Sequence, residues 1–188
     1  MSEPVSFEGH PWVIALFERL KERNETVAFA ESCTGGLLSA MVTRIPGVSS
    51  VFLGSCVSYS NESKIKLLGV PEATLHANGA VSLPTALAMA KGAREKFGST
   101  WSVSITGIAG PDGGTPEKPV GTVCFAVVGP GIDDRENETV ARRRFPGARR
   151  EVQFRAARYA LAMLLIELGF SKDELKGLLR GEKTGKRR

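Results

Sequence analysis

The stretch TVAFAESCTGGLLSAMV, residues 26–42, places a polar turn between a predicted strand and a predicted helix. The apolar run 26–30 is typical of a buried strand, and residues 37–42 are typical of a helix. Between them lie hydroxyl, thiol and glycine residues: Ser32, Cys33, Thr34, Gly35 and Gly36. Backbone amides at the start of a helix point outward at its positive end. Such a turn binds an anion, or presents a nucleophile beside an oxyanion hole.

Predicted strands alternate with predicted helices along most of the chain. Helices are predicted over residues 11–23, 61–68, 71–77, 83–97 and 148–168, and strands over residues 26–30, 51–59, 101–106, 120–128 and 138–145. The helix after the glycine turn is predicted to end by Pro46-Gly47, and a last short helix precedes the C-terminal tail. This alternation predicts an α/β fold whose sheet is covered on both faces. Because no helix separates the last two strands, the sheet is predicted to be mixed, with an antiparallel part.

The size and composition of the chain are those of an ordinary globular protein. Its 188 residues, 42% apolar and 24% charged, are enough for one domain with a substantial core. We expect residues 1–172 to form this domain, and residues 173–188 to form a short helix and a basic, disordered tail. No apolar run approaches the roughly 20 residues that span a bilayer. Residues 1–10 lack a signal pattern, so a cytoplasmic protein without membrane contact is expected.

Charge and cysteine content argue against two classes of function. Of the net charge of +5, the tail at residues 181–188 contributes +3, because it holds four basic residues and one acidic residue. The rest of the chain is only mildly basic, which argues against nucleic-acid binding. Cys33, Cys56 and Cys124 are widely spaced and form no C-x-x-C pair. This spacing predicts neither a zinc site nor a disulfide framework.

The scarcity of histidine narrows the choice of a catalytic base. His10 and His76 both lie outside the glycine-rich and strand-end motifs, which argues against a Ser-His-Asp triad and against a catalytic zinc site. A base would then be a lysine, a tyrosine or a carboxylate. Tyr59 lies at the end of a predicted strand, and Lys64 lies in the first turn of the next helix. The helix dipole and burial would both lower the pKa of Lys64, although spacing alone favours an exposed lysine.

The residues of the glycine turn have structural explanations as well as catalytic ones. Ser32 is either a nucleophile or a helix N-cap, since serine is common at that position. Cys33 is either a nucleophile activated at the helix start or a small buried residue, and the lack of a nearby histidine favours burial. Thr34 is either a cap or a ligand group.

A glycine- and proline-rich loop over residues 107–119 follows the predicted strand that ends at Thr106. Loops of this length without secondary structure are usually binding loops or lids, although a surface connection is the alternative. Thr106 lies at the carboxyl end of its strand, where ligands collect in α/β sheets. The arginines at 142–144 alternate in direction along a strand, so they cannot all serve one site. Either Arg149 or Arg150 is a good phosphate partner.

Five motifs occur together in this chain. They are AESCTGG at residues 30–36, VSYSNESKIKLLGV at 57–70, GAVS at 79–82, TGIAGPDGGTPEKPVGTV at 106–123 and RFPGARR at 144–150. In this order they resemble the CinA C-terminal domain family, the nicotinamide-nucleotide amidohydrolases (PncC), over about residues 10–170. Many members of that family carry a further N-terminal domain similar to molybdopterin-binding domains. This chain resembles the stand-alone form.

The resemblance implies a three-layer α/β/α sandwich with a mixed, mainly parallel sheet. It implies deamidation of nicotinamide mononucleotide to nicotinate mononucleotide and ammonia, with neither cofactor nor metal. Ser32 is then the nucleophile, Lys64 its base and Tyr59 an assisting residue. Substrate contacts are expected at Cys33, Thr34, Gly35, Gly36, Thr106, Gly107, Gly110 and Arg149. The arginine of FPGAR is Arg149, although Arg144 and Arg150 lie close to it in sequence.

Two rival functions remain at the level of sequence. The first is a non-catalytic module that binds a nucleotide phosphate and regulates another process, such as the DNA uptake or repair that the family name suggests. The second is a cysteine amidase that uses Cys33. A homo-oligomer is also expected, because the apolar stripe of residues 148–168 is long for one domain to cover.

Overall fold

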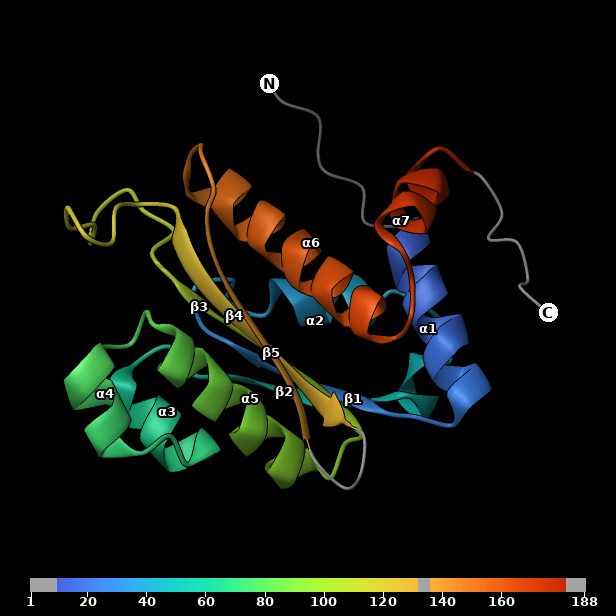
Figure 1. Cartoon of the computed structure of the whole chain (residues 1–188), viewed down its shortest axis with the longest axis horizontal. Helices are drawn as coiled ribbons and strands as arrows, with labels where there is room; N and C mark the ends of the chain where they lie inside the picture. The colour runs from blue at the N-terminus through green and yellow to red at the C-terminus, as the bar shows by residue number, and fades with distance from the viewer. Residues whose placement is uncertain (1–9, 132–135, 182–188) are drawn as a thin grey trace.

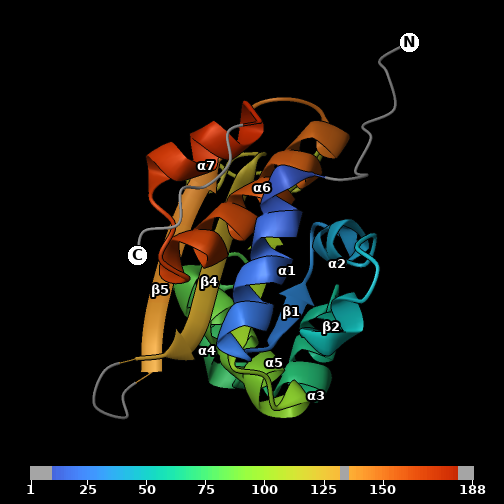
Figure 2. The ribbon, with the colours of Figure 1, turned by 90° about the vertical axis from the view of Figure 1, so that its right-hand side faces the viewer.

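The computed structural model of the protein describes residues 10–131 and 136–181, and in it a five-stranded sheet lies between two layers of helices (Figure 1, Figure 2). The elements are α1 (Pro11–Arg23), β1 (Val27–Glu31), α2 (Leu37–Val42), the 3₁₀ turn η1 (Val48–Ser50), β2 (Phe52–Val57), α3 (Asn61–Leu68), α4 (Glu72–Asn78), α5 (Leu83–Phe97), β3 (Trp101–Gly107), β4 (Thr122–Pro130), β5 (Glu136–Arg144), α6 (Arg149–Glu167) and α7 (Lys172–Leu179). The predicted three-layer α/β/α sandwich is confirmed.

The sheet has the strand order β2-β1-β3-β4-β5. Strand β1 pairs in parallel with β2 and β3, whereas β4 is antiparallel to both β3 and β5. Among the described strands only β4 therefore runs against the others, which makes the sheet mixed and mainly parallel, as expected. Glu31 at the end of β1 is in register with Val57 of β2 and Ile105 of β3. The carboxyl ends of these three strands consequently meet at one edge of the sheet.

Helices α1, α2, α6 and α7 cover one face of the sheet and enclose the larger part of the core (Figure 1). The predicted stripe of α6 faces inward, and its residues Val152, Ala156, Ala160 and Leu164 are buried. Since the chain itself covers this stripe, the stripe no longer supports an oligomer, and a homo-oligomer stays a prediction. Helix α7 is held against α1 by a hydrogen bond of 2.7 Å from Trp12 Nε1 to the Leu175 carbonyl. The expected division of the chain at residue 172 also stays a prediction.

Helices α3, α4 and α5 cover the other face, where two serines join α5 to the central strand β3. The hydroxyl groups of Ser102 and Ser104 donate to the backbone carbonyls of Ala90 and Ala86, at 2.7 and 2.6 Å. Both serines are fully buried. Buried hydroxyl groups with an acceptor cost little, so the alternating serines of β3 mark the strand face that packs on α5.

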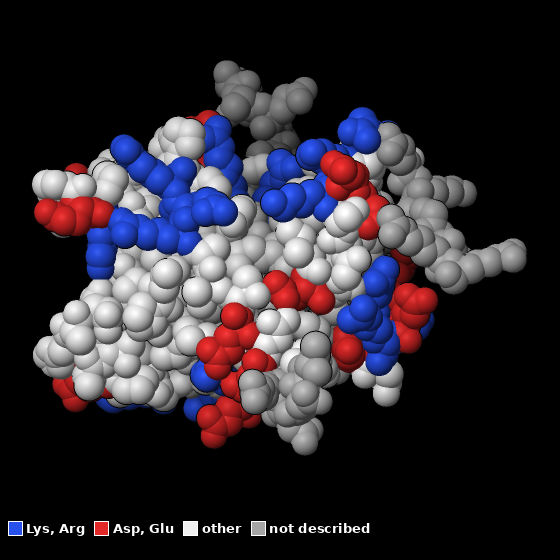
Figure 3. Space-filling view, in the orientation of Figure 1, with Lys and Arg blue, Asp and Glu red and all other residues white. Residues whose placement is uncertain are grey.

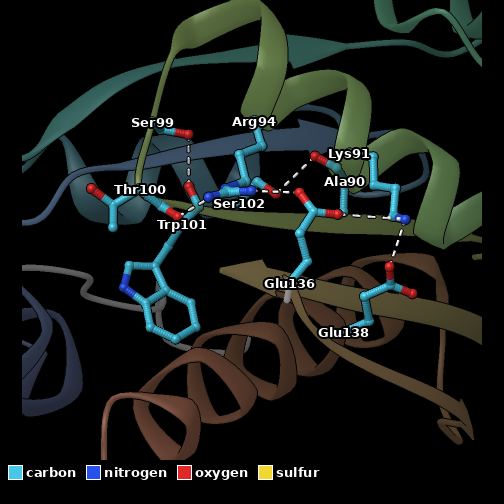
Figure 4. Close-up of polar contacts among 9 residues, drawn as sticks. All are labelled: Ala90, Lys91, Arg94, Ser99, Thr100, Trp101, Ser102, Glu136 and Glu138. Carbon is cyan, nitrogen blue, oxygen red and sulfur yellow. Dashed lines mark hydrogen bonds and ion pairs between the residues drawn. The ribbon is translucent and has the colours of Figure 1, made fainter. Parts of the chain in front are cut away.

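Ionic contacts extend the attachment of α5 to the edge strand β5 (Figure 4). Arg94 donates to the carbonyl of Thr100 at 3.0 Å and forms an ion pair with Glu136 at 2.5 Å. Lys91 forms a second ion pair, with Glu138, at 2.5 Å. Because these pairs are partly exposed, each contributes little to stability, but together they hold β5 in place beside α5.

Element boundaries agree closely with the sequence predictions where local signals mark them. The helices over residues 11–23 and 83–97 begin and end as predicted, and β1 is shifted by one residue from 26–30 to Val27–Glu31. The predicted strands 120–128 and 138–145 are observed at Thr122–Pro130 and Glu136–Arg144. The basic tail, predicted to be disordered, lies outside the described residues apart from Gly181. None of the described helices is both long and apolar enough to cross a membrane.

Candidate active site

The turn after β1 presents Ser32 at the carboxyl edge of the sheet. Gly35 and Gly36 have φ values of +64° and +94°, a backbone conformation that glycine adopts without strain. The N-cap of α2 is Gly36, which has no side chain that could cap the helix. The alternative prediction that Ser32 is a helix N-cap is therefore wrong. Its hydroxyl group instead lies against Lys64, which comes from a different part of the chain.

The start of α2 already binds an acidic group of the chain itself, the side chain of Glu31. The carboxyl oxygens of Glu31 accept hydrogen bonds from the backbone amides of Leu38 and Ser39, at 3.1 and 2.9 Å. They also accept one from the Ser39 hydroxyl group at 2.5 Å. The prediction that the amides at this helix start face outward to bind an anion is therefore wrong for these two amides. These contacts do not use the amides of Cys33 and Thr34, which lie in the turn ahead of α2.

Lys64 is a buried lysine, and only 1% of it is exposed. The expectation from spacing of an exposed lysine is thus wrong. Its Nζ lies 3.1 Å from Ser32 Oγ and donates to the carbonyl of Ser58 at 2.7 Å. Helix α3 holds it in place, and this helix begins at a capping box in which Ser60 and Ser63 exchange hydrogen bonds. Burial lowers the pKa of Lys64 from the ordinary lysine value, because a charged ammonium group loses its hydration there.

A cavity of about 250 Å³ opens beside the serine and the lysine at the carboxyl ends of β1, β2 and β3. It is lined by Ser32, Cys33, Tyr59, Lys64, Ala80, Val81, Thr106, Gly107, Ile108, Ala109, Gly110, Asp112, Gly113 and Arg149. Four separate segments of the chain therefore meet around it, together with the first residue of α6. Ligand sites in α/β sheets occur at this edge.

The structure brings most of the predicted site residues together. All three predicted catalytic residues line the cavity, and so do Cys33, Thr106, Gly107, Gly110 and Arg149. Thr34, Gly35 and Gly36 are not among the described residues that line it. Thr34 is buried, and its hydroxyl group has no partner within the described parts of the chain. The hydroxyl group of Thr106 donates to the Ala80 carbonyl at 2.8 Å, which ties β3 to the GAVS segment.

Arg149, the first residue of α6, joins the two sides of the cavity. Its guanidinium group donates to Tyr59 Oη at 2.5 Å and to the Gly110 carbonyl at 2.8 Å. Tyr59 itself is 58% exposed. Figure 3 shows lysine and arginine side chains gathered over the end of β5 and the start of α6. The exposed arginines at 142–144 and 149–150 belong to these two elements. Of these arginines, Arg149 lines the cavity, where its positive charge favours an anionic ligand.

Cys33 lines the cavity, but its thiol has the wrong protonation state for a nucleophile. The residue is only 4% exposed. Burial raises the pKa of the thiol to about 12, so the thiolate is scarce at neutral pH. The structure therefore favours the buried alternative for Cys33.

Several residues around the site were not singled out from the sequence. Ala80, Val81 and Asp112 line the cavity from motifs that carried the family resemblance, but no role was assigned to them. Gln153, one helical turn after Arg149, donates to the Cys33 carbonyl at 2.8 Å. The i, i+4 spacing of Arg149 and Gln153 on α6 was the available signal, because it places both residues on one face of that helix.

Fold and site together define an α/β protein with a buried serine–lysine pair in a cavity at the carboxyl edge of its sheet. The profile of the CinA C-terminal domain matches residues 12–168, so the chain belongs to this family. A CinA-like protein of Chlorobaculum tepidum is 51% identical over 149 residues, which cover 79% of this chain and 35% of the relative. A CinA-like protein of Anaeromyxobacter dehalogenans is 51% identical over 150 residues, 80% of this chain and 36% of that protein. The chain thus spans about a third of the length of these relatives.

Solved structures of the same superfamily share the fold. The competence/damage inducible protein CihA of Agrobacterium tumefaciens superposes with a TM-score of 0.79 at 36% identity, over 90% of this chain and 100% of that chain. A CinA superfamily protein of Klebsiella pneumoniae superposes with a TM-score of 0.78 at 32% identity, over 86% of this chain and 98% of that chain.

Proposed function

We propose that this protein is an amidohydrolase that converts nicotinamide mononucleotide into nicotinate mononucleotide and ammonia through a serine–lysine mechanism. The observation that supports the proposal most is the 3.1 Å distance between Ser32 Oγ and Lys64 Nζ beside a cavity. A lysine acts as a base only when it is neutral, and burial lowers the pKa of Lys64 in that direction. The carbonyl of Ser58 takes one N–H of the neutral amine, which leaves the nitrogen lone pair for the serine proton.

The first half of the reaction forms an ester on the enzyme. Ser32 Oγ attacks the carboxamide carbon while its proton passes to Lys64 Nζ. The amides of Cys33 and Thr34 stabilise the tetrahedral oxyanion, and loss of one such donor typically costs about 3 kcal/mol. The C–N bond of the intermediate then breaks as its nitrogen is protonated. Lys64 returns the proton through Tyr59, so that ammonia leaves as a neutral molecule.

The second half of the reaction regenerates the enzyme. Water attacks the nicotinoyl ester, gives a proton to Lys64, and releases the carboxylic acid as the proton returns to Ser32 Oγ. Arg149 and the glycine-rich loop hold the phosphate and ribose, so that the amide stays near the nucleophile. Arg149 lines the cavity at the start of α6, where Figure 3 shows basic side chains gathered, and its guanidinium group fits a substrate with a phosphate group.

The test is an ammonia assay with nicotinamide mononucleotide. We expect wild-type protein to release ammonia and the Ser32→Ala variant to release none while it keeps the wild-type unfolding midpoint. Ser50→Ala is the matched control, because Ser50 is exposed and its hydroxyl group donates only to the carbonyl of Gly47. Tight binding of the mononucleotide without ammonia release would instead favour a non-catalytic nucleotide-binding module.

A further inference from the structure

Glu31 is a buried acidic residue beside the proposed nucleophile. It ends strand β1, immediately precedes Ser32 and is 0% exposed. It is not among the described residues that line the cavity. An acidic residue is seldom fully buried unless its charge is compensated, so its position needs a physical explanation.

The side chain of Glu31 connects the end of β1 to the start of α2, on either side of the glycine turn. Both carboxyl oxygens accept hydrogen bonds, one from the amide of Leu38 and the other from the amide and hydroxyl groups of Ser39. Two oxygens that both accept are the pattern of an ionised carboxylate, and the positive start of α2 favours such a charge. The turn between Glu31 and α2 contains Gly35 and Gly36, which restrain the backbone least. These contacts therefore supply a restraint that the sequence of the turn does not.

The backbone of Glu31 reaches the other member of the pair. Its carbonyl oxygen accepts the amide of Ser58 at 2.8 Å, and the Ser58 carbonyl in turn accepts Lys64 Nζ at 2.7 Å. Lys64 Nζ returns to Ser32 Oγ at 3.1 Å. Glu31, Ser58, Lys64 and Ser32 thus form a closed ring of three hydrogen bonds and one peptide bond. Glu31 is the member of this ring that is also fixed to α2.

We propose that Glu31 is the positioning residue of the serine–lysine pair. Its side chain fixes the turn that carries Ser32, and its carbonyl fixes the segment that orients Lys64. It acts through these two residues without touching substrate, and the inference rests on the proposed amidohydrolase function. Displacing a reacting group by about 1 Å typically costs about 100-fold in rate. Loss of the carboxylate should therefore reduce turnover more than substrate affinity.

Glu31→Gln is the most informative substitution. It keeps the volume of the side chain but replaces one accepting oxygen by an NH₂ group, which would face an N–H or O–H donor at the start of α2. Glu25→Gln is the matched control. Glu25 Oε2 accepts the indole N–H of Trp101 at 2.7 Å, near the opposite end of β1 and away from the cavity.

Three measurements on these variants separate positioning from general stability: kcat and KM for ammonia release, the rate at which a fluorophosphonate probe labels Ser32, and the thermal midpoint. We expect Glu31→Gln to lower kcat and the labelling rate by about 10- to 100-fold, with little change in KM. Glu25→Gln should lower the thermal midpoint but leave both rates at the wild-type level. A Glu31→Gln variant that loses stability yet keeps wild-type kcat and labelling overturns the proposal.

A milder variant covers the case in which Glu31→Gln does not fold. Ser39→Ala removes one hydrogen bond to the carboxylate and leaves the two backbone contacts, so kcat and Ser32 labelling should fall by a few-fold. Unchanged rates in this variant would count against the positioning role.

If wild-type protein releases no ammonia, the proposed function fails, and the labelling rates alone then test Glu31. A wild-type Ser32 that neither reacts with the probe nor supports turnover overturns both proposals.

Discussion

Gly92 of α5 packs directly against the backbone carbonyl of Leu68 at the end of α3. A Cβ atom at position 92 would lie 1.8 Å from that carbonyl oxygen, which is far inside any real contact. The close approach of α3 to α5 therefore depends on glycine at position 92, which has no side chain. Because α3 carries Lys64, this packing contact also helps to set the distance from Lys64 Nζ to Ser32 Oγ.

Gly92→Ala is predicted to destabilise the fold and to impair the site. Alanine favours a helix over glycine by about 1 kcal/mol, but overpacking against a backbone costs typically about 1–3 kcal/mol. We expect the overpacking to dominate, with a lower free energy of unfolding in urea and a lower kcat as α3 moves away. A variant more stable than wild type, with unchanged kcat, would show that α3 adjusts without cost.

Lys64→Met is predicted to remove both the base and a pH dependence. General-base catalysis contributes about 10²- to 10⁴-fold to the rate, so kcat should fall by at least about 100-fold. In the wild type, kcat/KM should rise with pH through the lowered pKa of Lys64. Lys66→Met is the control, because Lys66 lies on the same helix, is exposed and pairs with Glu62. A variant at position 64 with the wild-type pH profile would exclude lysine from this role.

The lowered pKa of Lys64 also predicts how stability depends on pH. Between the folded pKa and the unfolded value of about 10.4, the unfolded chain binds more protons at this residue than the folded chain. The contribution of Lys64 to the free energy of unfolding should therefore rise with pH across that window and level off above it. Urea unfolding at several pH values measures this slope. The free energy of unfolding should rise less steeply with pH in Lys64→Met than in Lys66→Met. Equal slopes in the two variants would contradict the lowered pKa of Lys64.

Cys33→Ala is predicted to keep most of the amidase activity. With a thiol pKa of about 12, iodoacetamide should modify Cys33 slowly at neutral pH and leave ammonia release intact. Mass spectrometry of the treated protein, beside the ammonia assay, measures both effects. Complete loss of activity in Cys33→Ala, with the fold retained, would support the cysteine amidase alternative.

Arg149→Met tests the phosphate site. Hydrogen bonds to a charged group are worth about 1.5–3 kcal/mol, so kcat/KM for nicotinamide mononucleotide should fall about 10- to 100-fold. The corresponding riboside, which lacks the phosphate, should lose much less. Arg150→Met is the neighbouring control and should behave as wild type. If Arg150→Met shows the phosphate-specific loss instead, Arg150 is the phosphate partner.

The sequence by itself determined the elements whose boundaries have local causes. Pro11 and Pro84 lie at helix starts and Gly98 follows a helix end, which explains why the helices over residues 11–23 and 83–97 were predicted without error. The turn, the glycine-rich loop and the FPGAR segment were also recognisable, because their unusual residues follow strand ends or precede helices. Most residues that line the cavity lie in these motifs.

Tertiary structure alone decided the burial of the two ionisable residues Lys64 and Glu31. Spacing favoured an exposed Lys64, yet α3 packs closely enough on α5 to bury it against Ser32. The predicted strand ended at Ala30 because the apolar run ends there, yet Glu31 continues β1 inside the protein, where the amides of α2 compensate its charge. Local sequence shows hydrophobic periodicity and capping residues, which predict helices and strands. The solvation of a charge depends on partners that are distant along the chain, and only the folded structure brings them together.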